Sequence, residues 1–294
     1  MKAYKNILII GGTGYLGSKF IDALLFSDLE IFCWKRSNSD IGRLAKLADR
    51  IEFYEEGIAN LKEYILEKNI DTIVYMACVY ESGDNDLEVI DANLNLPLQI
   101  MDIGIEAEVS KFISISTSLP ENVNLYSLTK RKFGEIGKVY TKLHQNFTFY
   151  EVLLESFYGE DEPENRFISR CIVSLLKNEN IDLTEGKQRR DYIHISDVID
   201  GLLLIFHCDE KGYQQFQLGS GEAPTIREII EYLKEITGSL SLLNFGARKS
   251  RLYEPDCCAD LSDMDSLGFI VNYTWKEGLR RMVECKKDID EREE

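Results

Sequence analysis

The residues best suited to acid–base chemistry are Tyr126 and Lys130, in a helical pattern that begins near Asn124. Their spacing of four residues places both side chains on one face of a helix. A nearby ammonium group favours the phenolate and lowers the pKa of a tyrosine, which makes it a usable proton donor or acceptor near neutral pH. A cluster of hydroxyl residues, Ser116, Thr117 and Ser118, follows a predicted strand at 111–115. This combination favours an acid–base site over a surface tyrosine.

A glycine-rich turn follows the first predicted strand, at residues 6–10, and leads into a helical pattern beginning at Ser18. In such a turn Gly11 permits the tight bend, Gly14 lets a dinucleotide pyrophosphate approach the backbone, and Gly17 allows close helix packing. The phosphates then lie at the helix N-terminus. We therefore predict a dinucleotide site and not a merely structural turn. Its predicted contacts are Gly11, Thr13, Gly14, Tyr15, Leu16 and Gly17.

The end of the second predicted strand, at 30–34, bears on the choice of cofactor. Chains that bind NAD usually place an acidic residue here, against the ribose 2′-hydroxyl. This chain has Lys35 and Arg36 instead. Two cations suit a 2′-phosphate, because a guanidinium can hold phosphate oxygens in a bidentate fork. The sequence favours NADP(H), and the alternative is a solvated, charged loop.

Short β-rich runs alternate with longer helical patterns in the first half of the chain. This alternation predicts an α/β fold with a doubly wound parallel sheet of the Rossmann type and a smaller C-terminal substrate-binding lobe. The predicted strands are 6–10, 30–34, 51–54, 72–77, 111–115 and 148–154. An acidic loop at 159–165 ends the alternation. We place a dinucleotide-binding domain at 1–155 and mainly the substrate-binding lobe at 156–294, with segments returning to the first domain.

Two helices are predicted beyond the acidic loop, at 167–176 and 225–236. The second is opened by Thr225 with Glu228 three residues later, which is an N-terminal capping pattern.

Composition excludes several classes of partner. The 294 residues include 34 Lys and Arg against 51 Asp and Glu, for a formal net charge of -17. Nucleic acid is disfavoured, because phosphate backbones are bound through concentrated positive charge. The longest apolar run, 73–80, is far shorter than the roughly 20 residues of a membrane helix, and the start lacks a signal-peptide pattern. We expect a soluble, cytoplasmic protein without membrane contacts. The seven cysteines and three histidines lack metal-site spacing, so we expect no metal.

Taken together, the motifs resemble the extended short-chain dehydrogenase/reductases that act on nucleotide sugars, the NAD-dependent epimerase/dehydratase family. The matching segments cover nearly the whole chain and read GGTGYLG, IVYMAC, DANLNLP, ISTS, YSLTK, FYGE, QRRDYIHISDV, FQLGSGE, RLYEP and DLSDMDSLGF. The resemblance implies that Thr117 binds the substrate carbonyl, with Ser116 as the alternative. It makes Tyr126 the proton donor and Lys130 the residue that binds the nicotinamide ribose. It also assigns Ile58, Ala77 and Tyr126 to contacts with the cofactor.

Within this family the chain is most similar to the 4-ketoreductases that make CDP-linked 3,6-dideoxyhexoses, the abequose and paratose synthases. The similarity lies in LLESFYGEDE and LTEGKQRRDYIHISDV. It assigns Arg190 and Arg251 to the nucleotide diphosphate, for which two guanidiniums are a suitable clamp. The alternative for each arginine is an ion pair between lobes. Ser156 and Glu254 are assigned to substrate.

The chain also departs from the family pattern. Gly57 stands where many relatives have an aspartate near the adenine, and Ser156 replaces a common substrate-binding asparagine. The segment from Thr117 to Tyr126 is shorter than usual, so the substrate loop is reshaped.

Three functions fit these residues. The first is NADPH-dependent reduction of a nucleotide-linked 4-keto (deoxy)sugar, with CDP the favoured nucleotide, in deoxysugar or surface polysaccharide biosynthesis. The second is an epimerase or 4,6-dehydratase, which Lys35 and Arg36 disfavour. Ser118 and Leu119 also stand where a dehydratase of this family has Asp-Glu. The third is a catalytically silent NADP(H)-binding regulator. By resemblance we expect a homodimer formed through residues 87–105 and 126–143.

Overall fold

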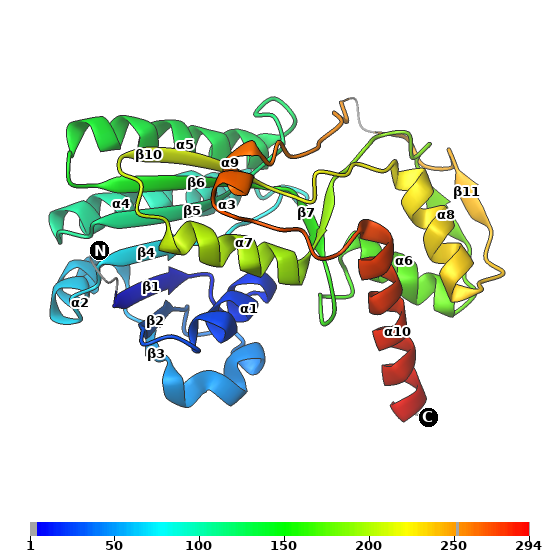
Figure 1. Cartoon of the computed structure of the whole chain (residues 1–294), viewed down its shortest axis with the longest axis horizontal. Coiled ribbons are helices and arrows are strands. Elements are labelled where there is room, and N and C mark those ends of the chain that lie inside the picture. The colour runs from blue at the N-terminus through cyan, green and yellow to red at the C-terminus, as the bar shows by residue number, and fades with distance from the viewer. Residues whose placement is uncertain (1–4, 251–252, 294) are drawn as a thin grey trace. The chain divides into compact units, whose positions relative to one another are not determined.

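The computed structural model describes residues 5–250 and 253–293 (Figure 1). The chain divides into two compact units, which are described separately. Unit 1 comprises Met1–Leu153 and Leu202–Phe216, and unit 2 comprises Leu154–Gly201 and Gln217–Glu294.

Unit 1 is built on a seven-stranded sheet with the order β10-β6-β5-β4-β1-β2-β3. The strands are β1 (Asn6–Ile10), β2 (Glu30–Trp34), β3 (Glu52–Tyr54), β4 (Thr72–Tyr75), β5 (Lys111–Thr117), β6 (Thr148–Leu154) and β10 (Tyr213–Leu218). The pairs β1/β2, β1/β4, β2/β3 and β4/β5 are parallel. Strand order reverses beside β1, where chain crossovers pass from one face of the sheet to the other. The predicted doubly wound α/β fold is confirmed.

Helices cover both faces of this sheet. They are α1 (Tyr15–Leu24), α2 (Leu61–Glu67), α3 (Asp86–Ile90), α4 (Leu96–Glu106), α5 (Leu125–Leu143) and the end of α7 (Ile195–His207), with 3-10 turns η1 (Gly42–Arg50) and η2 (Ile58–Asn60) and a π-helical turn η3 (Asp91–Asn95). On one face α2, α4 and α5 contribute Ile65, Met101 and Phe133 to a buried cluster. Phe20 of α1 meets Phe206 of α7, with ring centroids 6.4 Å apart.

Two glycines of helix α5 face β6 and allow the helix to pack close to the sheet. A Cβ atom at Gly137 would lie 2.6 Å from the Phe149 ring, and one at Gly134 would overlap the Glu151 carboxylate. Larger residues would push the helix away from the strand. The glycines therefore fix the height of α5 above the sheet.

Unit 2 consists of small parallel strand pairs packed with helices. The pairs are β7 (Ser156–Tyr158) with β9 (Tyr192–His194) and β8 (Ile181–Leu183) with β11 (Leu243–Phe245). The helices are α6 (Phe167–Leu176), α8 (Ile226–Thr237), α9 (Ser262–Ser266) and α10 (Trp275–Glu293). Ile172, Ile229 and Met282 join α6, α8 and α10 in one buried cluster. Thr225 and Glu228 form the predicted capping box of α8.

Most predicted elements agree with the structure to within two residues. The strands at 6–10, 30–34 and 148–154 and the helix at 167–176 have the predicted bounds. The main correction concerns β5, which continues to Thr117, so Ser116 and Thr117 belong to the strand and do not follow it. Among the described helices, none has the length and apolar character needed to cross a bilayer.

Candidate active site

The glycine turn lies at the carboxyl end of β1, next to the point where the strand order reverses. Open α/β sheets bind ligands at this kind of position. Gly11 has a φ of +89°, and a Cβ atom there would lie 2.6 Å from the backbone nitrogen of Ala77, just after β4. A Cβ atom at Gly17 would lie 2.7 Å from the Cα of Gly12. These two glycines are needed for the bend and for packing.

Gly14 plays a different part, because the nearest neighbour of a Cβ atom there is the Gly11 carbonyl at 3.4 Å. It is the N-cap of α1, with no side-chain cap and no acidic residue in the first turn of the helix. The first backbone N–H groups of a helix carry partial positive charge and lack partners within the helix. An open, uncapped N-terminus fits a dinucleotide pyrophosphate, and Thr13, Tyr15 and Leu16 lie in the same turn.

At the end of β2, Lys35 and Arg36 have different surroundings. The ammonium of Lys35 lies 2.7 Å from the Glu55 carboxylate, and its side chain is only 9% exposed. Arg36 is exposed, and among the described residues no carboxylate pairs with it. The ion pair already compensates the lysine charge, which leaves Arg36 as the cation better suited to meet a phosphate.

The turn after β3 contains Gly57 and Ile58. Ile58 is partly buried against the core of unit 1. Gly57 has extended backbone angles, and its carbonyl accepts a hydrogen bond from the Tyr54 hydroxyl at 2.9 Å. A Cβ atom at Gly57 would meet nothing within 4 Å. The position therefore has room for the aspartate that many family members carry.

The end of β5 brings Thr117 to Tyr126, and a hydrogen bond joins their side chains. The side chains are 5% and 9% exposed. Successive residues of a strand point to opposite faces, so the neighbouring Ser116 points away from Tyr126. Its buried hydroxyl has no hydrogen-bond partner among the described residues. The geometry supports Thr117 over Ser116 as the hydroxyl that acts with Tyr126.

Lys130 lies one turn after Tyr126 on α5 and is 3% exposed. Its ammonium donates to the carbonyls of Ile115 and Ala77, at 2.8 and 3.2 Å. The lysine thereby joins α5 to the ends of β5 and β4, where Ala77 also touches the glycine turn.

The structure does not show the expected lowering of the Tyr126 pKa by Lys130. Burial raises the pKa of Tyr126 well above its usual value, Tyr80 and Cys78 raise it further, and the hydrogen bond with Thr117 acts in the opposite direction. Burial also lowers the pKa of Lys130. The prediction that the ammonium lowers the tyrosine pKa was wrong for this state, because backbone carbonyls take the lysine's hydrogen bonds.

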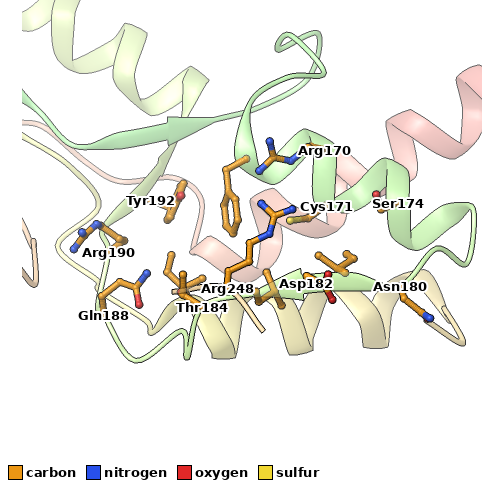
Figure 2. A pocket seen from close by; sticks show the side chains of 14 residues that line it. Arg170, Cys171, Ser174, Asn180, Asp182, Thr184, Gln188, Arg190, Tyr192 and Arg248 are labelled. Atoms are coloured by element: carbon orange, nitrogen blue, oxygen red, sulfur yellow. The ribbon is translucent and has the colours of Figure 1, made fainter. Parts of the chain in front are cut away.

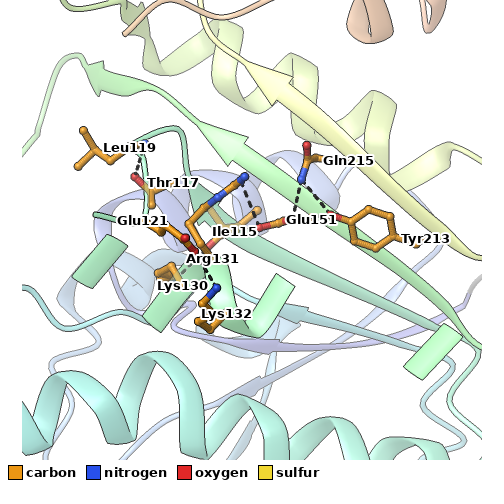
Figure 3. A network of polar contacts seen from close by, with 10 residues as sticks. All are labelled: Ile115, Thr117, Leu119, Glu121, Lys130, Arg131, Lys132, Glu151, Tyr213 and Gln215. Atoms are coloured by element: carbon orange, nitrogen blue, oxygen red, sulfur yellow. Dashed lines mark hydrogen bonds and ion pairs between the residues drawn. The ribbon is translucent and has the colours of Figure 1, made fainter. Parts of the chain in front are cut away.

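Three carboxylates hold the first turns of α5 in place, and Figure 3 shows two of them, Glu121 and Glu151. Glu81 accepts from the backbone N–H of Leu125 at 2.7 Å, and Glu121 pairs with Lys132 at 2.8 Å. Glu151 of β6 lies 3.5 Å from Arg131 and accepts hydrogen bonds from Tyr213 and Gln215 of β10. The helix that carries Tyr126 and Lys130 is therefore anchored on several sides.

The loop after β4 is held by the π-helical turn η3. Its buried Asn93 accepts from the N–H of Val79 at 3.1 Å and donates to the Val79 carbonyl at 2.8 Å. Both hydrogen-bonding groups of one loop residue are thus satisfied by one side chain. Since π-helical turns are frequent at functional sites, this clamp is part of the candidate site.

Unit 2 contains a pocket of about 370 Å³ (Figure 2), which is within the size range of small-molecule sites. It lies between α6, β8 and the segment that leads into β9. Its polar lining residues are Arg170, Cys171, Ser174, Asn180, Asp182, Thr184, Gln188, Arg190, Tyr192 and Arg248.

Three guanidinium groups give this pocket its charge. Figure 2 shows Arg248 extending toward Arg170, while Arg190 lies beside Tyr192 and Gln188. Burial raises the pKa of Cys171 to about 12, and Arg170 and Arg248 act in the opposite direction. Within the described ranges none of these three arginines forms an ion pair. Such a set of cations suits an anion with several oxygens, such as a diphosphate.

The residues that the resemblance assigns to the nucleotide and the sugar differ in whether they line this pocket. Arg190 lines the pocket, and its guanidinium donates to the backbone carbonyls of Arg189 and Pro255. Ser156, at the start of β7, and Glu254 are partly buried and lie outside the pocket lining. Arg251 lies outside the described residues.

Sequence reasoning missed Arg170 and Arg248. The signal for Arg248 was its place three residues before Arg251, and that for Arg170 was its spacing of four from Ser174 on a predicted helix.

Two acids of the QRRDYIHISDV segment organise unit 2. Buried Asp191 accepts from the backbone N–H groups of Ser220, Gly221 and Ala259. Buried Asp197 accepts from those of Asn272 and Tyr273. These carboxylates tie loops together, which accounts for their presence without a chemical role.

Residues 7–219 match the model of the NAD dependent epimerase/dehydratase family. The chain is 26% identical to CDP-abequose synthase of Salmonella typhimurium, over 94% of this chain and 97% of that protein. It is 23% identical to a putative UDP-glucose 4-epimerase of Methanocaldococcus jannaschii, over 96% and 98%.

Solved structures share the fold. A UDP-glucuronic acid 4-epimerase of Bacillus cereus, in complex with UDP-glucuronic acid and NAD, has a TM-score of 0.86 at 23% identity and covers 97% of this chain and 99% of its own. A UDP-glucose 4-epimerase of Thermotoga maritima with UDP-glucose has a TM-score of 0.85 at 20% identity, with the same coverage. The family match extends from β1 through β10 and includes the glycine turn, Thr117, Tyr126 and Lys130, so the chain belongs to the NAD dependent epimerase/dehydratase family of extended short-chain dehydrogenase/reductases.

Proposed function

We propose that this enzyme reduces a nucleotide-linked 4-keto deoxysugar, with CDP as the favoured nucleotide and NADPH as the reductant. The proposal rests mainly on Thr117, Tyr126 and Lys130, which lie buried together at the carboxyl edge of the sheet. Bound NADPH supplies the hydride. The protein's own task is to bind the substrate oxygen and to protonate it.

The roles of the residues follow from their contacts. The Thr117 hydroxyl is close enough to Tyr126 for both to bond one carbonyl oxygen. The raised pKa of Tyr126 keeps the phenol protonated, as a proton donor must be before reduction. Lys130 holds α5 to the strand ends and carries a positive charge beside the reacting groups. Positive charge favours the transition state as the oxygen becomes anionic.

The unit 2 pocket supports binding of a nucleotide diphosphate. Arg170, Arg190 and Arg248 provide bidentate donors for phosphate oxygens. Asp182 can accept a hydrogen bond from an amino group such as that of cytosine. The similarity of the chain to CDP-abequose synthase supports CDP over UDP as the nucleotide of the substrate.

Support for NADPH rests mainly on Arg36, because Glu55 already pairs with Lys35. Because this ion pair weakens the case for a 2′-phosphate, it favours a second candidate, an NAD-dependent epimerase. One solved epimerase of the same fold is in complex with NAD. An epimerase returns the hydride to the sugar and so consumes no reductant. The two functions therefore differ in their stoichiometry.

We also propose that unit 1 forms a homodimer through α3, α4 and α5. Leu87, Val139 and Leu143 on α3 and α5 are 78%, 51% and 69% exposed. Apolar side chains on neighbouring helices are suited to a self-association surface. Sedimentation velocity should show a dimer, and the variant V139E/L143E should be a monomer. A wild-type monomer at all concentrations contradicts this proposal.

The function is tested with NADPH or NADH and 4-keto sugars on CDP, UDP, dTDP and GDP. The expected result is stoichiometric loss of nicotinamide absorbance and a product that has gained two hydrogen atoms, fastest with NADPH and a CDP sugar. Tyr126→Phe serves as the control for background oxidation. A parallel assay supplies the 4-hydroxy sugars with oxidised NAD, and an isomeric product formed there without net change of the cofactor supports the epimerase. A protein that binds cofactor and nucleotide without turnover contradicts both enzymes and supports the silent regulator.

A further inference from the structure

An exposed tyrosine lies on the buried Tyr126. The rings of Tyr80 and Tyr126 have centroids 4.7 Å apart and planes at 32°, and a hydrogen bond links their side chains. Tyr80 is 59% exposed, whereas Tyr126 is 9% exposed. The acid–base residue thus has a second phenol between its hydroxyl and solvent.

The position of Tyr80 is fixed by its neighbours in the loop after β4. Asn93 bonds both backbone groups of Val79. The Tyr80 carbonyl accepts a hydrogen bond from Asn85 at 3.0 Å. Glu81 binds the first N–H of α5, one residue before Tyr126. A side chain held on both sides in sequence stays over Tyr126 at low entropic cost.

We propose that Tyr80 is a positioning residue for Tyr126 and the route by which that phenol recovers its proton from solvent. The inference rests on the proposed function, in which Tyr126 gives up a proton in each turnover. In the step proposed here, the O–H bond of Tyr80 breaks as a new O–H bond forms on the Tyr126 phenolate. Tyr80 then takes a proton from water, so the net donor is solvent.

Lys130 is less suited to this task. It is 3% exposed, and two backbone carbonyls accept its hydrogen bonds. Tyr80 also raises the pKa of Tyr126, which is the direction expected when the Tyr126 hydroxyl donates to its neighbour. The hydrogen bond must reverse once Tyr126 has lost its proton, and a hydroxyl can both donate and accept.

The test compares Tyr80→Phe, which keeps the ring, with Tyr140→Phe at the other end of α5. We expect Tyr80→Phe to lower kcat about 3- to 10-fold, the effect of one neutral hydrogen bond. The variant should regain rate as the concentration of imidazole buffer increases, because an external acid replaces the missing donor. Wild type and Tyr140→Phe should not respond to buffer. A Tyr80→Phe enzyme with wild-type kcat, or a slow one that buffer does not rescue, overturns the inference.

A second measurement does not depend on turnover. Protein labelled with fluorotyrosine gives one ¹⁹F signal for Tyr126, assigned by its loss in Tyr126→Phe. Its titration should move to lower pH in Tyr80→Phe, because Tyr80 raises the pKa of Tyr126. An unchanged titration overturns the inference even if the enzyme reduces sugars. A shifted titration in a protein that turns over no sugar supports the contact and contradicts the proposed function.

Discussion

The carboxyl edge of the sheet in unit 1, which carries Thr117, Tyr126 and Lys130, is called the reaction edge. It differs from the pocket of unit 2 in whether its charged side chains have partners. Lys130 is buried and donates to two carbonyls, and the start of α5 is held by Glu81, Glu121 and Glu151. The pocket instead gathers Arg170, Arg190 and Arg248 without an ion pair in the described part of the chain. Fixed, satisfied groups suit a reaction in which atoms must stay aligned. Uncompensated cations suit capture of an anion. The rate of reaction should therefore respond to substitutions in unit 1, and the affinity for the nucleotide to substitutions in unit 2.

The largest expected effect is on rate, at the reaction edge. Tyr126→Phe should lower kcat about 10²- to 10⁴-fold, as is typical for loss of a general acid. Because only one hydroxyl is removed, the Kd for NADPH should change little. Steady-state kinetics and nicotinamide fluorescence measure the two quantities. A kcat near the wild-type value would contradict the role of Tyr126 as proton donor. A large loss of NADPH binding would contradict the assignment of rate alone to this residue.

The pocket should show the opposite pattern. Arg190→Ala and Arg248→Ala should each weaken CDP binding about 10- to 100-fold, the range for a lost charged hydrogen bond, and change kcat much less. Calorimetric titration with CDP measures the affinity. Arg227→Ala is the matched control, because Arg227 pairs with Glu231 outside the pocket lining. Equal losses in all three variants would mean that net charge, and not the pocket, attracts the nucleotide.

A smaller effect is expected at the end of β2. Arg36→Ala should reduce the preference for NADPH over NADH about 10-fold, because one phosphate contact is lost. Lys35→Ala should reduce it less, since Glu55 already neutralises that lysine. The pair Lys35→Asp with Arg36→Ala should remove most of the preference. The ratio of kcat/KM for the two cofactors is the measurement, and equal values in the wild type contradict the NADPH assignment.

The smallest effect is expected at Gly57. Gly57→Asp should change the free energy of unfolding by less than about 0.5 kcal/mol, because a Cβ atom meets nothing there. It should tighten cofactor binding about 3-fold by adding one hydrogen bond. Chemical denaturation and fluorescence titration check both. Gly11→Ala is the contrasting variant, since its Cβ would collide with Ala77, and it should lose stability and cofactor together.

The sheet was predictable because buried parallel strands read as short, mainly apolar runs, such as residues 6–10. The same reasoning did not find the three-residue strands of unit 2, such as β8 and β11. A run of three residues is too short for a periodic signal of its own, and the three-residue β3 was predicted only from its place in the alternation of strands and helices. The helix at 225–236 was found because its cap uses residues adjacent in sequence.

The site was predictable where its residues share one helix or turn. Tyr126 and Lys130 lie on one helix, and the spacing of four brings them together on one face. The Lys35–Glu55 pair and the contact of Tyr80 with Tyr126 join segments far apart in the chain. Sequence spacing carries no information about such contacts. For the same reason the pKa of Tyr126 was predicted in the wrong direction, since burial and Tyr80 outweigh a lysine that bonds elsewhere.

The π-helical turn η3 has a consequence for how the chain can change in length. Each residue of an α-helix turns the chain by about 100°, so deleting one residue from Asp91–Asn95 would restore regular winding and swing Asn93 away from Val79. The deletion would leave the apolar face of α4 able to pack again after a rotation, yet it would release the loop that carries Tyr80 and Glu81. An ordinary surface helix tolerates a one-residue deletion. Here the deletion would disturb the start of the helix that carries Tyr126, through the hydrogen bonds of Asn93 with Val79 and of Glu81 with Leu125. Engineering of this scaffold should therefore preserve the residue count between β4 and α4 before it preserves any particular side chain on that helix.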